Sequence, residues 1–281
     1  MRYRRPGLDV ATHVILIIGA LIFMLPVLLA LMASTHTLPS LLSGGLALLP
    51  GSEGLDHYIQ LLTQPAGGVA VPTWRLMLNS LIMALGIAVG KLTISIIAAY
   101  AIVFFRFRFR MLCFWLIFVT LMLPVEVRIV PTYGVVADLG LLNSYPGLIL
   151  PLIASATATF LFRQFFLTLP PELLEAARLD GAGPWRFFRD ILLPLSKTNM
   201  AALFVIMFIY GWNQYLWPLL AASDADYATL VMSLRRLTIA QDGVPPWQLA
   251  TTMTVLALLP PVAVIVLMQR WFVKGLVDSE K

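Results

Sequence analysis

Long apolar runs separated by short polar segments dominate the pattern of this chain. A helix of about 20 residues crosses a hydrocarbon core of about 30 Å, and several runs reach that length. We therefore expect transmembrane helices near residues 11–33, 75–104, 111–133, 140–166, 199–222 and 248–272. The pattern predicts an all-α integral membrane protein with six transmembrane helices, in which residues 1–281 form a single transmembrane domain.

Most of these runs contain internal prolines, at Pro26, Pro124, Pro151, Pro218, Pro260 and Pro261. Proline removes a backbone donor and bends a helix. Such breaks are tolerated where neighbouring helices or a water-lined cavity satisfy the freed backbone groups. The bends therefore either line a transport pathway or reflect the higher frequency of proline in membrane helices.

The composition agrees with a membrane protein. Apolar residues make up 60% of the chain and charged residues 12%, about half of the roughly 25% that is usual in soluble domains. A single cysteine, Cys113, excludes an intrachain disulfide and a cysteine metal cluster. The histidines, His13, His36 and His57, are scattered without ligand spacing. We therefore expect no metal site.

The 19 Lys and Arg residues are distributed unevenly between the predicted loops. With the N-terminus placed inside, most lie on the cytoplasmic side, and Lys91 falls within a span. The outer side holds only Arg75, Arg128, Arg235 and Arg236. Cytoplasmic loops carry such an excess of basic residues, so we expect both termini in the cytoplasm. The net charge of +5 then reflects membrane topology, and we expect no nucleic-acid partner.

The segment at 167–198 is polar and patterned as two short helices. Thr168 is placed to cap the first helix, and Pro171 suits its first turn. Gly181 is placed to end this helix in a left-handed turn, and Pro184 begins the second. The second helix holds Trp185, Arg186, Phe187, Phe188, Arg189 and Asp190, and Pro194 ends it.

The two short helices are expected to expose aromatic and charged side chains together. Glu175 and Arg178 stand three residues apart and are placed to form an ion pair. Apolar anchors with charged flanks are typical of a helix that docks into a partner's groove. An interfacial helix on lipid is the alternative, although the acidic residues of this segment disfavour anionic lipid.

A set of positions in this segment matches a known motif. Glu175, Ala176, Ala177, Gly181, Ile191, Leu193 and Pro194 resemble the EAA loop of ABC-importer permeases at its full spacing. The resemblance implies a type I ABC-importer permease fold with cytoplasmic coupling helices. It also implies that the segment sits in a cleft of a cytoplasmic ATPase and transmits its motion to the membrane helices.

The likeness covers the whole chain. Asn79–Leu81, Ala98–Ala101 and Trp212–Pro218 are similar to carbohydrate-type permeases related to the maltose importer. Leu121–Ile129, Ser155–Phe166 and Phe208–Pro218 resemble the permeases of sn-glycerol-3-phosphate importers more closely. This implies a bacterial cytoplasmic (inner) membrane protein that imports sn-glycerol 3-phosphate or glycerophosphodiesters, with a sugar or oligosaccharide as the alternative substrate.

The resemblance also implies the partners. They are a homologous permease subunit, a cytoplasmic ATPase dimer and an extracytoplasmic substrate-binding protein. The C-terminal segment Gln269–Leu276 resembles the tail that reaches into the ATPase interface in maltose-type permeases, but this chain ends five residues later, at Lys281.

A nucleotide site within this chain is not expected. The nearest approach to a phosphate-binding loop, Gly86–Leu92, is one residue short and has Leu where Ser or Thr belongs. Gly86 and Gly90 instead predict a small-residue packing face. We expect a non-enzymatic subunit with no catalytic residue and no cofactor of its own, with ATP and Mg²⁺ on the partner. Less favoured alternatives are a stand-alone secondary transporter, which should show internal repeats and buried acids, and a membrane enzyme.

Charged and polar groups within spans are candidates for a pathway because they are costly there. The candidates are Glu126, Arg128, Trp212, Asn213 and Gln214. Arg128 presents a fork that fits phosphate oxygens, but an ion pair with Glu126 or extension toward the interface is the alternative. Extension of the side chain toward the interface is also the alternative for Lys91. Hydrogen-bonding side chains either line a cavity or join helices, at Asn79, Ser155, Thr157, Thr159 and Tyr210.

Overall fold

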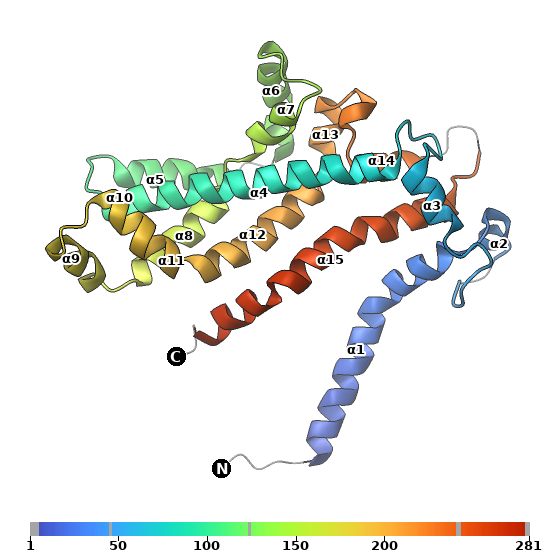
Figure 1. The fold of residues 1–281 in the computed structure, drawn as a ribbon, viewed down its shortest axis with the longest axis horizontal. Coiled ribbons are helices and arrows are strands. Elements are labelled where there is room, and N and C mark those ends of the chain that lie inside the picture. The colour runs from blue at the N-terminus through green and yellow to red at the C-terminus, as the bar shows by residue number, and fades with distance from the viewer. Residues whose placement is uncertain (1–5, 45–46, 123–124, 240–242, 279–281) are drawn as a thin grey trace. The chain divides into compact units, whose positions relative to one another are not determined.

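The computed structural model describes residues 6–44, 47–122, 125–239 and 243–278 (Figure 1). Every regular element in these ranges is helical, which confirms the predicted all-α class. Its long helices are α1 (Pro6–Ala33), α4 (Thr73–Phe104) and α15 (Trp247–Asp278). Each contains a stretch long and apolar enough to cross a membrane. Three of the predicted spans are therefore continuous helices.

Shorter elements complete the described chain. The α-helices are α2 (Leu38–Leu42), α3 (Asp56–Thr63), α5 (Arg110–Val119), α6 (Val125–Asp138), α7 (Tyr145–Ile149), α8 (Ala156–Thr168), α9 (Glu172–Leu179), α10 (Pro184–Phe187), α11 (Leu193–Leu195), α12 (Lys197–Trp212), α13 (Leu216–Ala221) and α14 (Leu230–Leu237). The short turns are the 3-10 helices η1 (Thr120–Met122), η2 (Leu150–Leu152) and η4 (Ala225–Tyr227), and the π-helical turn η3 (Phe188–Leu192).

The other three predicted spans are interrupted. The 111–133 run is divided into α5 and α6, and the 199–222 run into α12 and α13. In the 140–166 run, α7 with η2 meets α8 at an angle of 49°. By length and composition, the described residues hold three spanning helices, or up to five if each bent helix pair counts as one span. The count of six is therefore not reached by this criterion.

Proline explains the break before α8. Pro151 has no N–H to donate to the carbonyl oxygen of Gly147, four residues earlier. That oxygen instead accepts a hydrogen bond from the indole Nε1 of Trp217 at 3.2 Å. The helix resumes at α8, where the hydroxyl of Ser155 caps the backbone N–H of Ala158 at 3.2 Å. A side chain from another helix thus satisfies the group that proline leaves free.

The described chain divides into two compact units. The first comprises residues up to 75 together with 233–259, and the second comprises 76–232 together with the residues from 260 on. In the first unit, the carbonyl oxygen of Ser34 bonds to the Nδ1 of His57 at 2.9 Å and to the hydroxyl of Thr252 at 3.3 Å. Ser34 therefore joins the end of α1 to α3 and α15.

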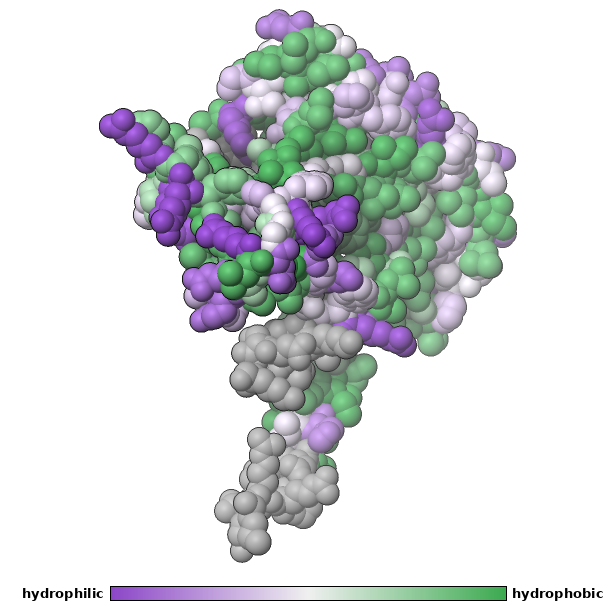
Figure 2. All heavy atoms as spheres, turned by 60° about the vertical axis from the view of Figure 1, so that its left-hand side comes forward, coloured by the Kyte–Doolittle hydropathy of each residue, from purple (hydrophilic) through white to green (hydrophobic). Residues whose placement is uncertain are grey.

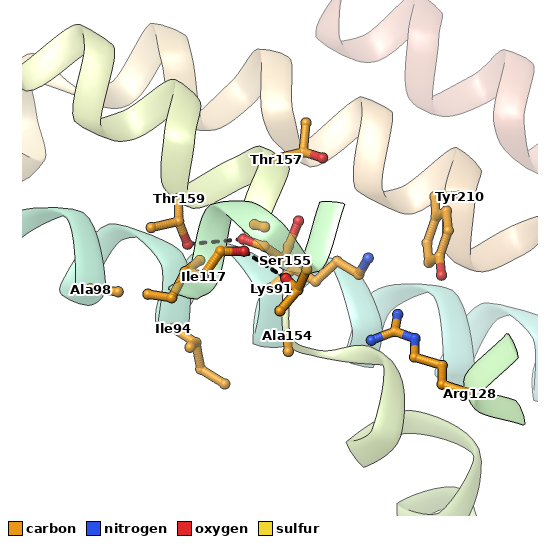
Figure 3. A pocket seen from close by; sticks show the side chains of 12 residues that line it. Lys91, Ile94, Ala98, Ile117, Arg128, Ala154, Ser155, Thr157, Thr159 and Tyr210 are labelled. Carbon is orange, nitrogen blue, oxygen red and sulfur yellow. Dashed lines mark hydrogen bonds between the residues drawn. The ribbon is translucent and has the colours of Figure 1, made fainter. Parts of the chain in front are cut away.

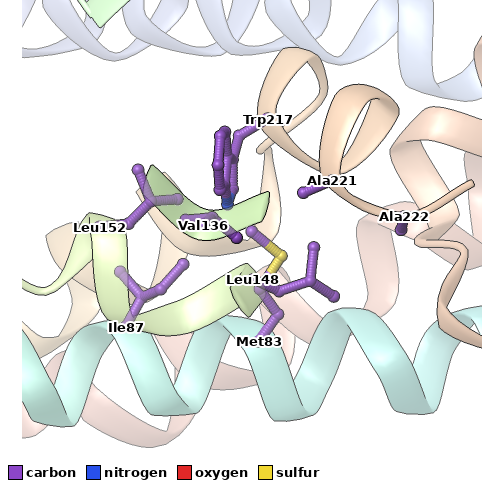
Figure 4. Packing of buried hydrophobic residues seen from close by; sticks show 8 residues of the cluster. All are labelled: Met83, Ile87, Val136, Leu148, Leu152, Trp217, Ala221 and Ala222. Carbon is purple, nitrogen blue, oxygen red and sulfur yellow. The ribbon is translucent and has the colours of Figure 1, made fainter. Parts of the chain in front are cut away.

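The second unit has its own apolar core (Figure 4). The core brings together buried side chains from α4, α6, α7, η2 and α13, namely Met83, Ile87, Val136, Leu148, Leu152, Trp217, Ala221 and Ala222. In the same unit α8 contacts both α5 and α12. The helices α4, α8 and α12 of this unit also carry residues that line the cavity described below.

The predicted glycine packing face on α4 is confirmed. A Cβ atom at Gly86 would lie 2.6 Å from Ile149, and one at Gly90 would lie 2.5 Å from Ile153. Both distances are below van der Waals contact. The absence of a side chain therefore lets the end of α7 and the residue after η2 approach α4 closely, as small residues do between membrane helices.

Candidate functional site

The connector between α8 and α12, residues 167–198, folds largely as the sequence predicts. Its first helix, α9, ends at Leu179, and Gly181 follows with φ of 72°. The backbone N–H of Ala182 donates to the carbonyl of Ala177 at 2.8 Å, and that of Gly181 donates to Arg178 at 3.1 Å. This pair of bonds defines a left-handed helix cap, so the predicted turn at Gly181 is confirmed.

Two predictions for the connector are wrong in detail. Thr168 is the last residue of α8, and its hydroxyl donates to the carbonyl of Phe165 at 2.7 Å instead of capping α9. The second helix passes through the π-helical turn η3 and continues to Leu195, one residue beyond Pro194. Because Pro194 has no N–H for the carbonyl of Asp190, the regular ladder of hydrogen bonds is interrupted there.

The expected ion pair within α9 is also not formed. Across the described residues, the ion pairs join Asp190 to Arg186 at 3.8 Å and to Arg189 at 2.7 Å. The hydrogen bond with Asp190 raises the pKa of Arg189. Since these groups are exposed, their pairing contributes little to stability. Glu175 and Arg178 thus remain available to a partner.

The EAA-motif positions divide into a buried side and an exposed side. Ala177 is buried, and Ile191 and Leu193 are half-buried. The exposed positions are Glu175, Ala176, Gly181 and Pro194. Figure 2 shows hydrophilic side chains gathered on the face that carries α9 and α10. The motif therefore places the side chain of Glu175 and the turn at Gly181 on the protein surface.

The aromatic residues of the connector are divided in the same way, which corrects the expectation that they are exposed together. Trp185 is 68% exposed, whereas Phe187 and Phe188 are buried. Their rings pack against α4, with centroids 5.3 Å apart for Phe104 and Phe187 and 5.0 Å apart for Tyr100 and Phe188. These two phenylalanines therefore attach the connector to a membrane helix.

A hydrogen bond reinforces this attachment. The hydroxyl of Tyr100, near the end of α4, donates to the carbonyl oxygen of Pro184 at 2.8 Å. A cavity of about 910 Å³ adjoins this contact, and its lining includes Glu175 and Arg178 of α9 and Arg106 of the loop after α4. The connector is thus bound to α4 through Pro184, and a cavity lies between the connector and the neighbouring helices.

A second cavity, of about 380 Å³, lies nearer the middle of α4, where α8 begins (Figure 3). Its lining includes Lys91 of α4, Arg128 of α6 and Tyr210 of α12. Lys91 is 7% exposed, and its Nζ lies 3.8 Å from the centre of the Tyr210 ring. Figure 3 shows the guanidinium of Arg128 pointing toward the same space. Two cations from different helices therefore converge on one cavity.

Lys91 does not take the route to the interface that its long stem allows. From a rise of about 1.5 Å per residue, it lies about 20 Å from the inner end of α4 and about 27 Å from the outer end. Its amino group is instead held by a cation–π contact. The sequence alone already indicated Lys91 as a candidate functional residue, because a lysine within an apolar run is costly and is a functional candidate by default.

The other pathway candidates lie elsewhere. Trp212 is buried and stacks on Phe208, and Gln214 donates to the carbonyl of Tyr210 at 3.1 Å. Asn213 follows α12 and is exposed. None of these three side chains lines the cavity at Lys91. The side chain of Glu126 lies outside the described residues.

Asn79 joins helices instead of lining a cavity. Its Nδ2 donates to the carbonyls of Asp226 and Ala228 at 2.7 and 2.8 Å, and its Oδ1 accepts from the hydroxyl of Tyr145 at 2.8 Å. The side chain is fully buried. In the part of the chain that the structure describes, no three metal-ligating side chains lie together.

Comparisons with known proteins agree with this anatomy. Residues 91–278 match the family of binding-protein-dependent transport system inner membrane components. The sn-glycerol-3-phosphate transport system permease protein UgpE of Brucella melitensis biotype 1 is 55% identical over 99% of both chains. The protein of the same name from Pectobacterium atrosepticum is 55% identical, and that from Yersinia pestis bv. Antiqua is 56% identical, each with 99% coverage of both chains.

A solved structure is similar over nearly the whole chain. It is a bacterial ABC transporter involved in the import of the acidic polysaccharide alginate. The TM-score is 0.82, with 97% of this chain and 99% of that chain covered, at 21% sequence identity. At this identity the likeness bears on the fold alone, and it confirms the predicted permease fold.

Proposed function

The chain belongs to the family of binding-protein-dependent transport system inner membrane components, and on this premise we propose that it is the permease subunit of an ATP-driven importer of sn-glycerol 3-phosphate. Relatives that are 55–56% identical over nearly their full length carry the name of that transport system. Their names support the substrate, and glycerophosphodiesters share its phosphate chemistry. A neutral sugar is the alternative that experiment must separate.

The proposed assembly contains four kinds of component. This chain pairs with a homologous permease to form the pathway, an external binding protein delivers substrate, and an ATPase dimer binds ATP and Mg²⁺ in the cytoplasm. The family is described as an inner membrane component. The excess of Lys and Arg in the predicted inner loops supports cytoplasmic termini and a cytoplasmic connector.

The observation that carries this proposal is that one helix, α4, holds both candidate sites. Tyr100 binds the connector, and Lys91 lines the cavity that Arg128 and Tyr210 share. The two residues lie about 13 Å apart along the helix axis, from a rise of about 1.5 Å per residue. Because an uninterrupted helix is stiff, a displacement of the connector reaches the cavity directly.

The connector residues take distinct roles in the proposed coupling. The exposed Glu175, Ala176 and Gly181 contact the ATPase. The buried side chain of Ala177 and the half-buried Ile191 and Leu193 keep the two short helices in a fixed arrangement. Pro194 loosens the hydrogen-bond ladder next to the 72° bend between the connector and α12.

The test is reconstitution of the complete importer in proteoliposomes. ATP hydrolysis and uptake should rise together when the binding protein is loaded with sn-glycerol 3-phosphate, and should stay at the basal level with maltose. A response to the sugar alone would overturn the proposed substrate. Uptake driven by an ion gradient without ATP would instead support a stand-alone transporter and overturn the proposed machine.

A further inference from the structure

The cavity at Lys91 and Arg128 has an unusual balance of charge. Two cationic side chains face it, and none of the described residues that line it is acidic. A cation within a membrane domain is costly and is normally paired, yet the described partner of the Lys91 amino group is the ring of Tyr210. The arrangement therefore favours an anion as an additional partner.

We propose that Lys91, Arg128 and Tyr210 form a transient subsite in the permease for the phosphate group of the transported molecule. This inference rests on the proposed function and deepens it, because it places part of the substrate selectivity in this chain. A phosphate monoester offers up to two negative charges and three acceptor oxygens. Arg128 contributes a planar fork for two of those oxygens, and Lys91 contributes a mobile point charge.

The backbone at the start of α8 adds to the same potential. Ala156 and Thr157, the first two residues of α8, line the cavity. The N-terminus of a helix carries partial positive charge and points its N–H groups outward. The N-terminal end of α8 therefore adjoins the cavity that Lys91 and Arg128 also line.

The contacts at this subsite favour transient binding of the phosphate group over tight binding. A cation–π contact is weaker than a hydrogen-bonded ion pair, so the Lys91 amino group can leave the ring of Tyr210 for an incoming phosphate. The side chain of Arg128 is exposed, which lets it meet the anion at the cavity's open side. The volume of about 380 Å³ is sufficient for a molecule of the size of glycerol phosphate.

A purely structural role is the competing explanation. Lys91 would then only tie α4 to α12 through the ring of Tyr210. Arg163 provides a matched comparison, because its guanidinium lies 4.3 Å from the ring centre of Phe114 and does not line this cavity. Loss of either cation should then have the same effect on the assembled importer.

The test uses the complete importer in proteoliposomes, with Lys91→Met, Lys91→Arg, Arg128→Gln and the control Arg163→Gln. The readout is the number of sn-glycerol 3-phosphate molecules transported per ATP hydrolysed, at a saturating concentration of loaded binding protein. We expect about a tenfold drop for Lys91→Met and for Arg128→Gln. Lys91→Arg should recover most of the transport, and Arg163→Gln should stay within twofold of the wild type.

Each result decides the proposal. Unchanged transport per ATP in Lys91→Met and Arg128→Gln would overturn it, and so would an equal loss in Arg163→Gln. If Lys91→Met does not assemble, Arg128→Gln and Lys91→Arg decide the outcome by the same criteria. Failure of the wild-type complex to respond to sn-glycerol 3-phosphate would overturn the proposed function itself, which separates the two failures.

Discussion

The hydroxyl of Tyr100 donates a hydrogen bond to the carbonyl oxygen of Pro184 at 2.8 Å. Tyr100 belongs to α4, and Pro184 is the first residue of α10 in the connector. This bond therefore ties the start of α10 to the membrane domain through the carbonyl oxygen of Pro184. The contact joins the segment that is proposed to meet the ATPase to the helix that lines the cationic cavity.

Removing the Tyr100 hydroxyl should weaken coupling without unfolding the protein. In Tyr100→Phe the ring contacts with Phe104 and Phe188 remain, and one hydrogen bond of about 1 kcal/mol is lost. We expect a several-fold decrease in substrate-stimulated ATP hydrolysis by the reconstituted complex. Tyr133→Phe is the control, because Tyr133 is 38% exposed. If substrate-stimulated ATP hydrolysis is the same in Tyr100→Phe as in Tyr133→Phe, the bond has no role in coupling.

Gly181 should tolerate a small side chain better than a large one. No atom lies within 4 Å of a Cβ built at this position, so Gly181→Ala meets only the strain of φ at 72°, about 1–2 kcal/mol. Gly181→Trp adds bulk on the surface that is proposed to enter the ATPase. We expect normal membrane insertion of both variants, with loss of ATPase binding in Gly181→Trp only, measured by co-purification.

Gly183 supplies the control for this experiment. A Cβ at Gly183 also meets no atom, and its φ of −70° suits any residue. Gly183→Ala should therefore match the wild type in stability. If Gly181→Trp retains the ATPase and full transport, the proposed contact at the turn is wrong.

Reversing the charge of Glu175 should impair docking and leave folding intact. Glu175 is exposed and joins neither of the ion pairs found among the described residues. Glu175→Lys is expected to lower ATPase binding at least tenfold, while Glu172→Lys on the same exposed helix changes it little. The measurement is affinity between the purified ATPase and the permease pair. A similar affinity for both variants and the wild type would exclude this role.

Asn79 should matter for stability. Asn79→Ala leaves the carbonyl oxygen of Asp226, the buried carbonyl oxygen of Ala228 and the hydroxyl of Tyr145 without this partner. Unpaired buried polar groups cost about 1–3 kcal/mol, so the midpoint of thermal unfolding in detergent should fall by several degrees. Asn213→Ala, at an exposed position, should leave it unchanged. An unaltered midpoint for Asn79→Ala would contradict the joining role.

Local signals in the sequence predicted local structure well. Gly181 adopts the left-handed turn, and Gly86 and Gly90 form the packing face, because both features follow from the absence of a Cβ atom. The long helices α1, α4 and α15 also follow from apolar length. The predictions at Thr168 and Pro194 fail by small shifts, because capping and helix ends are settled by competing hydrogen bonds.

Contacts between distant segments were not predictable in the same way. The ring of Tyr210 lies over Lys91, and Phe187 and Phe188 turn inward against α4. Hydrophobic pattern alone assigns a short aromatic helix equally well to a partner, to lipid or to its own protein. The packing of helices decides between these outcomes, and a single sequence does not encode it in any local motif.

The central claim is that the connector meets the ATPase, and crosslinking tests it most directly. Leu179 is 89% exposed at the end of α9, and Cys113 is the chain's one cysteine. In a Cys113→Ser background, Leu179→Cys should crosslink to the ATPase subunit in assembled importer in inverted vesicles. Labelling of that cysteine by an impermeant reagent from the outer side of intact cells, without any crosslink to the ATPase, would contradict the account.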